Sequence, residues 1–105
     1  MTVFLDTHVA VFVHEGNPDL LSATAIHLLE SADSTRVSPI VVLELQYLFE
    51  SRKIAFPGDE IIGFLSDQFG VLVDTEGMGD AVLRSVGFSW TRDPFDRIIT
   101  AHAAL

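Results

Sequence analysis

The sequence predicts an α/β fold in which a short parallel sheet is flanked by helices. Three short apolar runs alternate with longer segments of helical periodicity, and this alternation is typical of parallel sheets. Two of the runs end in an aspartate, Asp6 and Asp74. Because ligands of such sheets bind beyond the carboxyl ends of the strands, we expect the functional site at that edge.

Local signals predict where each element begins and ends. Strands are expected over residues 2–6, 35–38 and 70–74, and a turn over 16–19. Helices are expected over 8–14, from Ser22 onward, and over 39–52, 57–69, 78–86 and from Asp93 onward. The clearest helix starts are Ser38 before Pro39 and Asp93 before Pro94, since each joins a capping side chain to a proline in the first turn.

The composition indicates one domain, residues 1–105, and excludes several protein classes. Hydrophobic residues make up 49% of the 105 residues and charged residues 20%, which excludes disorder and a coiled coil. The absence of cysteine excludes a disulfide scaffold, a thiolate zinc site and a cysteine nucleophile. No apolar run approaches the roughly 20 residues of a membrane span, and the start lacks signal-peptide features. We expect a cytoplasmic protein without a membrane partner.

The charge balance is strongly acidic, with a formal net charge of −9. This balance argues against a protein that coats nucleic acid through basic surface. It is compatible with acids that hold metal ions, with a basic partner, or with a solvated acidic face.

Glu44 is the most informative carboxylate. Its neighbours three and four residues away are Ile40, Val41, Tyr47 and Leu48, so the carboxylate is expected within a buried stripe. A buried carboxylate requires a cation, a metal ion, hydrogen bonds or protonation. An arginine partner or a satisfied polar position at the helix edge remains the structural alternative.

Three further aspartates are candidates, each with a structural alternative. Asp6 ends the first strand and is also suited to cap the next helix, with Thr7 as a second cap hydroxyl or a polar neighbour of a metal site. Asp93 is a natural N-cap, and Asp96 stands where it would complete a capping box. The case for Asp96 as a functional residue depends on its company with the other acids.

Other sequence signals are weak. The four histidines (His8, His14, His27 and His102) show no paired ligand spacing and are expected at the surface or an edge. The segment 77–79 lacks the third glycine of a dinucleotide fingerprint, and there is no phosphate loop or G-x-S-x-G elbow.

Three segments together resemble the motifs of PIN-domain ribonucleases, specifically VapC-like toxins of type II toxin–antitoxin systems. The segments are LDTHV at 5–9, SPIVVLEL at 38–45 and RDPFDRIITAHA at 92–103. They occur in the family's order and span nearly the whole chain. The resemblance implies a PIN-like three-layer fold and a Mg²⁺- or Mn²⁺-dependent endoribonuclease whose acidic residues are Asp6, Glu44 and Asp96. It also implies an RNA substrate, an antitoxin partner and a homodimer.

Elementary chemistry agrees with this role. Mg²⁺ prefers oxygen ligands and keeps several waters, so a few carboxylates suffice to hold it. Such an ion also bridges an acidic site to a polyanionic substrate. Arg92 and Arg97 flank the third motif and are candidates for RNA phosphates, with surface salt bridges as the alternative.

The chain departs from the family pattern at its end. PIN domains usually continue into another strand with a further acid, so we expect a missing C-terminal strand, an unpaired sheet edge and the absence of a fourth acidic position. Two rival functions remain open: a catalytically degenerate PIN fold that only binds an antitoxin, which the missing strand suggests, and a receiver-like signalling domain, which also gathers acids and Mg²⁺ at strand ends. The second rival would need a lysine at the end of a later strand. The only lysine, Lys53, is expected at the end of a helix instead.

Overall fold

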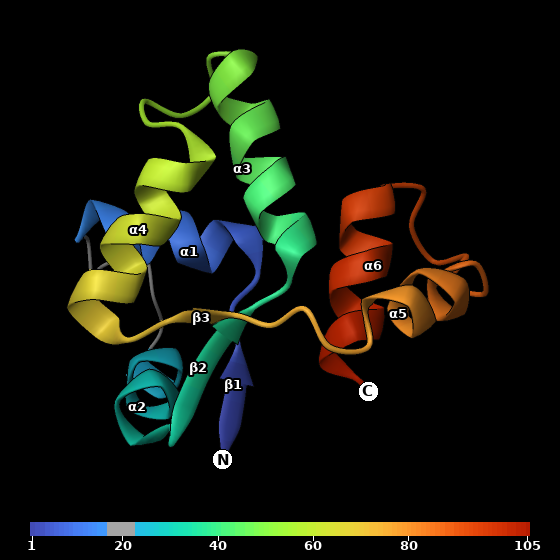
Figure 1. The fold of residues 1–105 in the computed structure, drawn as a ribbon, viewed down its shortest axis with the longest axis horizontal. Helices are drawn as coiled ribbons and strands as arrows, with labels where there is room; N and C mark the ends of the chain where they lie inside the picture. Colours follow the sequence, from blue (N-terminus) through green and yellow to red (C-terminus); the bar gives the residue numbers. More distant parts are fainter. Residues whose placement is uncertain (17–22) are drawn as a thin grey trace.

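The computed structural model describes residues 1–16 and 23–105 and contains a small parallel sheet flanked by helices (Figure 1). The elements in chain order are β1 (Thr2–Phe4), α1 (Thr7–Glu15), α2 (Ala23–Ser31), β2 (Ser34–Val37), α3 (Pro39–Glu50), α4 (Gly58–Phe69), β3 (Leu72–Val73), α5 (Met78–Ser85) and α6 (Pro94–Ala103). The expected cap at Ser22 and most of the expected turn at 16–19 lie outside the described residues. The α/β prediction is confirmed.

The sheet has the order β1-β2-β3, and both pairs are parallel. Val3 is in register with Thr35, and Val37 with Val73. The third strand is shorter than the predicted 70–74, because the amide of Val71 donates to the carbonyl of Leu65 in α4 rather than to a neighbouring strand. All three carboxyl ends meet at one edge.

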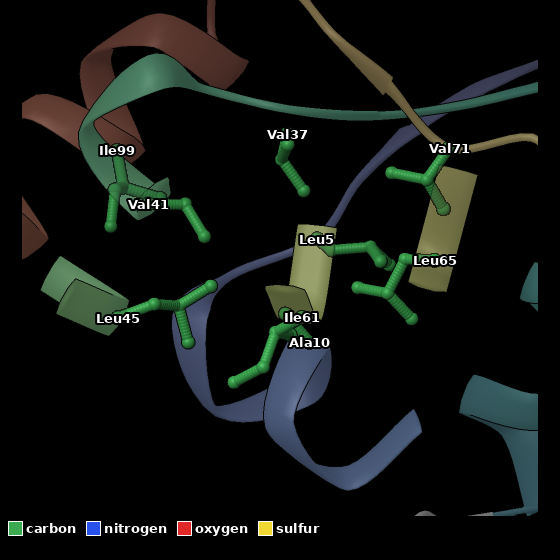
Figure 2. Close-up of a cluster of buried hydrophobic side chains, with 9 residues drawn as sticks. All are labelled: Leu5, Ala10, Val37, Val41, Leu45, Ile61, Leu65, Val71 and Ile99. Atoms are coloured by element: carbon green, nitrogen blue, oxygen red, sulfur yellow. The ribbon is translucent and has the colours of Figure 1, made fainter. Parts of the chain in front are cut away.

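One hydrophobic core joins the helices to the sheet (Figure 2). Leu45 of α3 and Leu65 of α4 are fully buried, and Leu5 extends β1 into the same cluster. Helices α1, α3 and α4 pack against one another. The approach of α4 to α3 is close at Gly58, where a Cβ atom would lie 2.7 Å from the carbonyl oxygen of Val42.

The last two helices form a separate pair, which Figure 1 shows in orange and red beside the β1 side of the sheet. Helix α5 packs on α6, and α6 also contacts α3. His102 of α6 is 2% exposed, its ring lies 5.5 Å from that of Phe4, and its Nε2 lies 2.7 Å from the carbonyl oxygen of Glu76. The expectation of a surface or edge position is therefore wrong for His102, because α6 packs this face against β1.

The apolar face of α4 is not buried along its whole length. Helical periodicity places Phe69 on the same apolar face as Ile61 and Leu65, which are both buried. Phe69 is nevertheless 57% exposed, since the last turn of α4 extends past the core. Its ring centroid lies 6.2 Å from that of Phe64. Within the described residues, no helix is long and apolar enough to cross a membrane.

Candidate functional site

Four carboxylates from three separate segments come together beyond the carboxyl end of β1. Asp6 follows β1, Glu44 lies in the second turn of α3, and Asp93 and Asp96 stand at the start of α6. The contact between α3 and α6 brings the last three into one neighbourhood. We call these four residues the acidic cluster.

Asp6 is held in place by a capping hydrogen bond. Its Oδ1 accepts from the amide of Val9 at 2.8 Å, and its extended backbone ends the strand before α1 begins. The predicted role as an N-cap is therefore confirmed. Only one carboxylate oxygen takes part in this bond, and within the described residues the other accepts no hydrogen bond.

Glu44 is buried, as the helical neighbours predicted, with only 9% of the residue exposed. The hydroxyl of Thr7, itself 2% exposed, donates to Oε1 of Glu44. Across residues 1–16 and 23–105, no lysine or arginine forms an ion pair with this carboxylate. The arginine alternative is thus not observed, and the Thr7 hydroxyl, a candidate for substrate binding from the sequence, donates to Glu44 in this structure.

The surroundings of Glu44 disfavour its charged form. Burial is the main cause and raises the pKa of Glu44 above its ordinary value, while the Thr7 hydrogen bond acts in the opposite direction. The negative charges of Asp93 and Asp96 raise this pKa further. A buried carboxylate facing like charges gains stability from any cation that enters the cluster.

At the start of α6, Asp93 and Asp96 have different roles. Asp93 Oδ1 accepts from the amides of Phe95 at 2.8 Å and of Asp96 at 3.4 Å, which confirms Asp93 as the N-cap. The predicted capping box does not close, because the amide of Asp93 donates to Thr91 Oγ1 at 3.2 Å instead. In the described part of the chain the carboxylate of Asp96 therefore accepts no hydrogen bond.

Asp96 also carries a perturbed carboxyl group. Partial burial raises the pKa of Asp96, and the charges of Asp93 and Asp6 add to this effect. The mutual influence of Asp6, Asp93 and Asp96 links the start of α1 to the start of α6. The sequence placed these four acids in three separate motifs. In the structure their charges influence one another.

His8 belongs to the same neighbourhood, although the spacing of the histidines did not select it as a site residue. Its charge lowers the pKa values of both Glu44 and Asp96, so it lies near both. His8 occupies the second position of α1, two residues after Asp6. Its place directly after the Asp6–Thr7 pair was the only available signal.

The two candidate phosphate ligands differ in their freedom. Arg97 donates from Nε to the carbonyl oxygen of Thr91 at 2.7 Å, and so holds the segment before α6. Arg92 is exposed and makes no hydrogen bond or ion pair with any residue that the structure describes. Of the two, Arg92 has the freer guanidinium group.

Asp74, the second acid at a strand end, is engaged in a different way. It lies 3.6 Å from Arg36 in an ion pair, and its Oδ1 accepts from the amide of Glu76 at 3.0 Å. The carboxylate is thus compensated by a cation and used to shape the loop after β3. It does not contribute to the acidic cluster.

The donor set of the acidic cluster suits a hard divalent cation, because all its ligating atoms are carboxylate oxygens. The excess negative charge around Glu44 points to the same kind of ligand. In the described ranges, however, no three carboxylates or imidazoles are close enough together to hold a metal ion as they stand. Binding would require the side chains to move toward one another.

Comparison of the chain with protein-family models, curated proteins and solved structures finds no match. The acidic cluster and its surroundings are therefore the features of the chain that indicate a function.

Proposed function

We propose that this chain is a divalent-metal-dependent endoribonuclease of the PIN type, acting as the toxin of a VapC-like toxin–antitoxin pair. The observation that carries the proposal is Glu44, a carboxylate with no basic partner in the described residues, whose charged form is disfavoured by burial and then by Asp93 and Asp96. If Glu44 had only a structural role, we would expect a lysine or arginine of the chain to pair with it, as Arg36 pairs with Asp74.

In this proposal, Asp6, Glu44 and Asp96 hold Mg²⁺ or Mn²⁺. Such an ion, when bound, activates water and neutralises charge on a phosphodiester during in-line attack. The chain itself orients the ligands: Thr7 fixes one oxygen of Glu44, and the capping bond to Val9 fixes one oxygen of Asp6. Asp93 contributes through the helix start that positions Asp96.

Two basic residues would help to bind RNA. Arg92, exposed and immediately before Asp93, is placed to contact a phosphate beside the acidic cluster. Arg97 holds the carbonyl of Thr91 and thereby fixes the segment that carries Arg92. A polyanion approaching a chain with a net charge of −9 needs both these cations and the metal ion.

Partners follow from the surface as part of the same proposal. The side chains of Leu83 and Val86 are 73% and 74% exposed, and Trp90 is 64% exposed. Exposed apolar residues on an acidic chain suit a homodimer contact and a basic or amphipathic segment of an antitoxin. Light scattering at micromolar concentration tests the dimer, and a clean monomer would contradict it.

The decisive experiment is a cleavage assay on single-stranded RNA with Mg²⁺ or Mn²⁺. We expect cleavage by the wild type, none with EDTA, and a loss of more than about 100-fold in Glu44→Gln, since loss of a residue that only supports a metal ligand already costs about 10–100-fold. Asp74→Asn is the matched control, because it removes a carboxylate at the same sheet edge. Equal activity in Glu44→Gln and the wild type would refute the proposal.

A second candidate is a catalytically degenerate PIN fold that only binds a partner. The observation that favours it is the spacing of the carboxylates. Within the described residues, no three of them are close enough together to hold a metal ion. Isothermal titration with Mn²⁺ separates the two candidates. Stoichiometric binding that Asp6→Asn abolishes supports the nuclease, and absence of binding supports the degenerate module.

A further inference from the structure

An aromatic pair borders the acidic cluster. Tyr47 lies on α3 one turn after Glu44, and Phe95 lies on α6 between Asp93 and Asp96. The two ring centroids are 6.1 Å apart with an interplanar angle of 35°. Residues three apart on a helix have Cβ atoms about 5–6 Å apart, so Tyr47 and Glu44 occupy neighbouring positions on α3.

The two rings have different environments. Phe95 is partly buried and packs against the hydrophobic core, so its position is fixed by the fold. Tyr47 is 56% exposed, and its hydroxyl makes no hydrogen bond to any residue in the described ranges. More than half of the surface of Tyr47 is therefore open to solvent, whereas a fully packed tyrosine buries most of its surface.

We propose that Tyr47, supported by Phe95, stacks on a base of single-stranded RNA whose neighbouring phosphate faces the acidic cluster. This inference rests on the proposed function and names the contact that selects single strands. Aromatic rings bind bases that are unstacked and splayed out, whereas the bases of a duplex are already stacked on each other. The contact is tolerant of sequence, because every base has a flat face.

Charge explains why such a contact is needed. The chain has six basic residues against fifteen acidic ones, and the exposed acids at the start of α6, close to Phe95, are Asp93 and Asp96. Phosphate contacts alone supply little affinity on such a surface. Stacking is an uncharged interaction, so it holds the RNA strand without adding electrostatic repulsion. The exposed Arg92, which directly precedes Asp93, adds one cation.

The sequence makes this inference directly measurable. Tyr47 is the only tyrosine and Trp90 the only tryptophan in the chain. In a Glu44→Gln/Trp90→Phe protein, which we expect not to cleave RNA, tyrosine emission reports on Tyr47 alone. We expect a single-stranded RNA decamer to quench this emission, and the same sequence annealed to its complement to leave it unchanged.

Affinity for the same decamer, measured by fluorescence anisotropy of labelled RNA, provides the second readout. In the Glu44→Gln background, Tyr47→Ala should raise the Kd by about 5- to 150-fold, the range for loss of one stacked base. Tyr47→Phe should keep the wild-type affinity, since it keeps the ring. Phe69→Ala removes an aromatic ring of matched exposure, 57%, on a different helix and should have no effect.

Several results would overturn the inference. It fails if Tyr47→Ala binds RNA as well as its parent, or if Tyr47→Phe loses as much affinity as Tyr47→Ala. It also fails if Tyr47→Ala changes the oligomeric state in light scattering and leaves RNA affinity unchanged, because a second copy of the chain would then cover the ring.

Cleavage kinetics keep this inference distinguishable from the proposed function. If the wild type cleaves RNA with Mg²⁺, Tyr47→Ala should raise KM and retain kcat, and an unchanged KM refutes the stacking contact alone. If the wild type cleaves no RNA but quenching and the affinity loss are observed, the nuclease proposal fails. The stacking site then stands as a binding site for single-stranded RNA.

Discussion

Two carboxylates beyond the ends of the strands, Asp74 and Glu44, have opposite surroundings. Asp74 faces the guanidinium group of Arg36 at 3.6 Å and caps the loop after β3. Glu44 is more deeply buried, has one hydroxyl donor, and faces the acids of α6 without a basic partner in the described residues. On the β2–β3 side of the sheet edge, the carboxylate of Asp74 is paired with a cation. On the side formed by α1, α3 and α6, the carboxylate of Glu44 has no such partner in the described residues.

This difference teaches how to distinguish a structural acid from a functional one. Both residues lie near the edge of the sheet where the strands have their carboxyl ends, so this position does not separate them. Compensation does separate them, because burying an unpaired carboxylate costs several kcal/mol. The unbalanced side is where a cation would restore stability, and we expect variants on the two sides to behave differently.

The largest difference is expected in the response to metal. Wild type and Asp74→Asn should both gain about 2.7 kcal/mol in the free energy of unfolding at a metal concentration 100 times the Kd. Asp96→Asn should gain far less, because it removes a free carboxylate of the acidic cluster. Urea denaturation with and without Mn²⁺ measures these gains, and equal gains in both variants would remove the distinction between the two sides.

An intermediate effect is expected at Thr7. Replacement by valine removes the hydroxyl that donates to Glu44 and should lower the free energy of unfolding by about 1–3 kcal/mol, the cost of an unsatisfied buried polar group. The pKa of Glu44 should rise further, since the Thr7 hydrogen bond lowers it. Denaturation and an NMR titration of Glu44 provide the measurements. Thr7→Ser is the control, and a Thr7→Val protein of unchanged stability would contradict the role assigned to this hydroxyl.

The smallest effect concerns stability without metal as a function of pH. The folded protein holds the Glu44 proton more tightly than the unfolded chain, since the pKa of Glu44 is raised above 4.5 on folding. The free energy of unfolding contributed by this group therefore falls as pH rises from about 4.5 through the raised pKa.

Glu44→Gln removes this loss and should be more stable than the wild type near pH 7. Asp74→Asn should instead be less stable, by about 0–1 kcal/mol, because it breaks an ion pair that is partly exposed. Thermal melts in EDTA between pH 4 and 8 compare the two variants. Destabilisation by both changes at pH 7 would mean that Glu44 also has a compensating partner.

Much of the local structure was predictable because its signals are contained in neighbouring residues. Ser38–Pro39 and Asp93–Pro94 correctly predicted the starts of α3 and α6, since a cap and a proline act within one turn. The burial of Glu44 followed from its helical neighbours. Phe69 lies on the same face of α4 as Ile61 and Leu65 yet is 57% exposed, since periodicity gives the face of a helix and not the point at which the core ends.

The sequence by itself determined the α/β class, the helix starts and the candidate acids, because these depend on periodicity, capping and residue type. Only the tertiary structure decided which acids meet. It paired Asp74 with Arg36, buried His102 against β1, and brought His8, Tyr47 and Phe95 to the acidic cluster. These outcomes depend on contacts between residues that are distant in the chain, whose partners are set by how α3 and α6 pack.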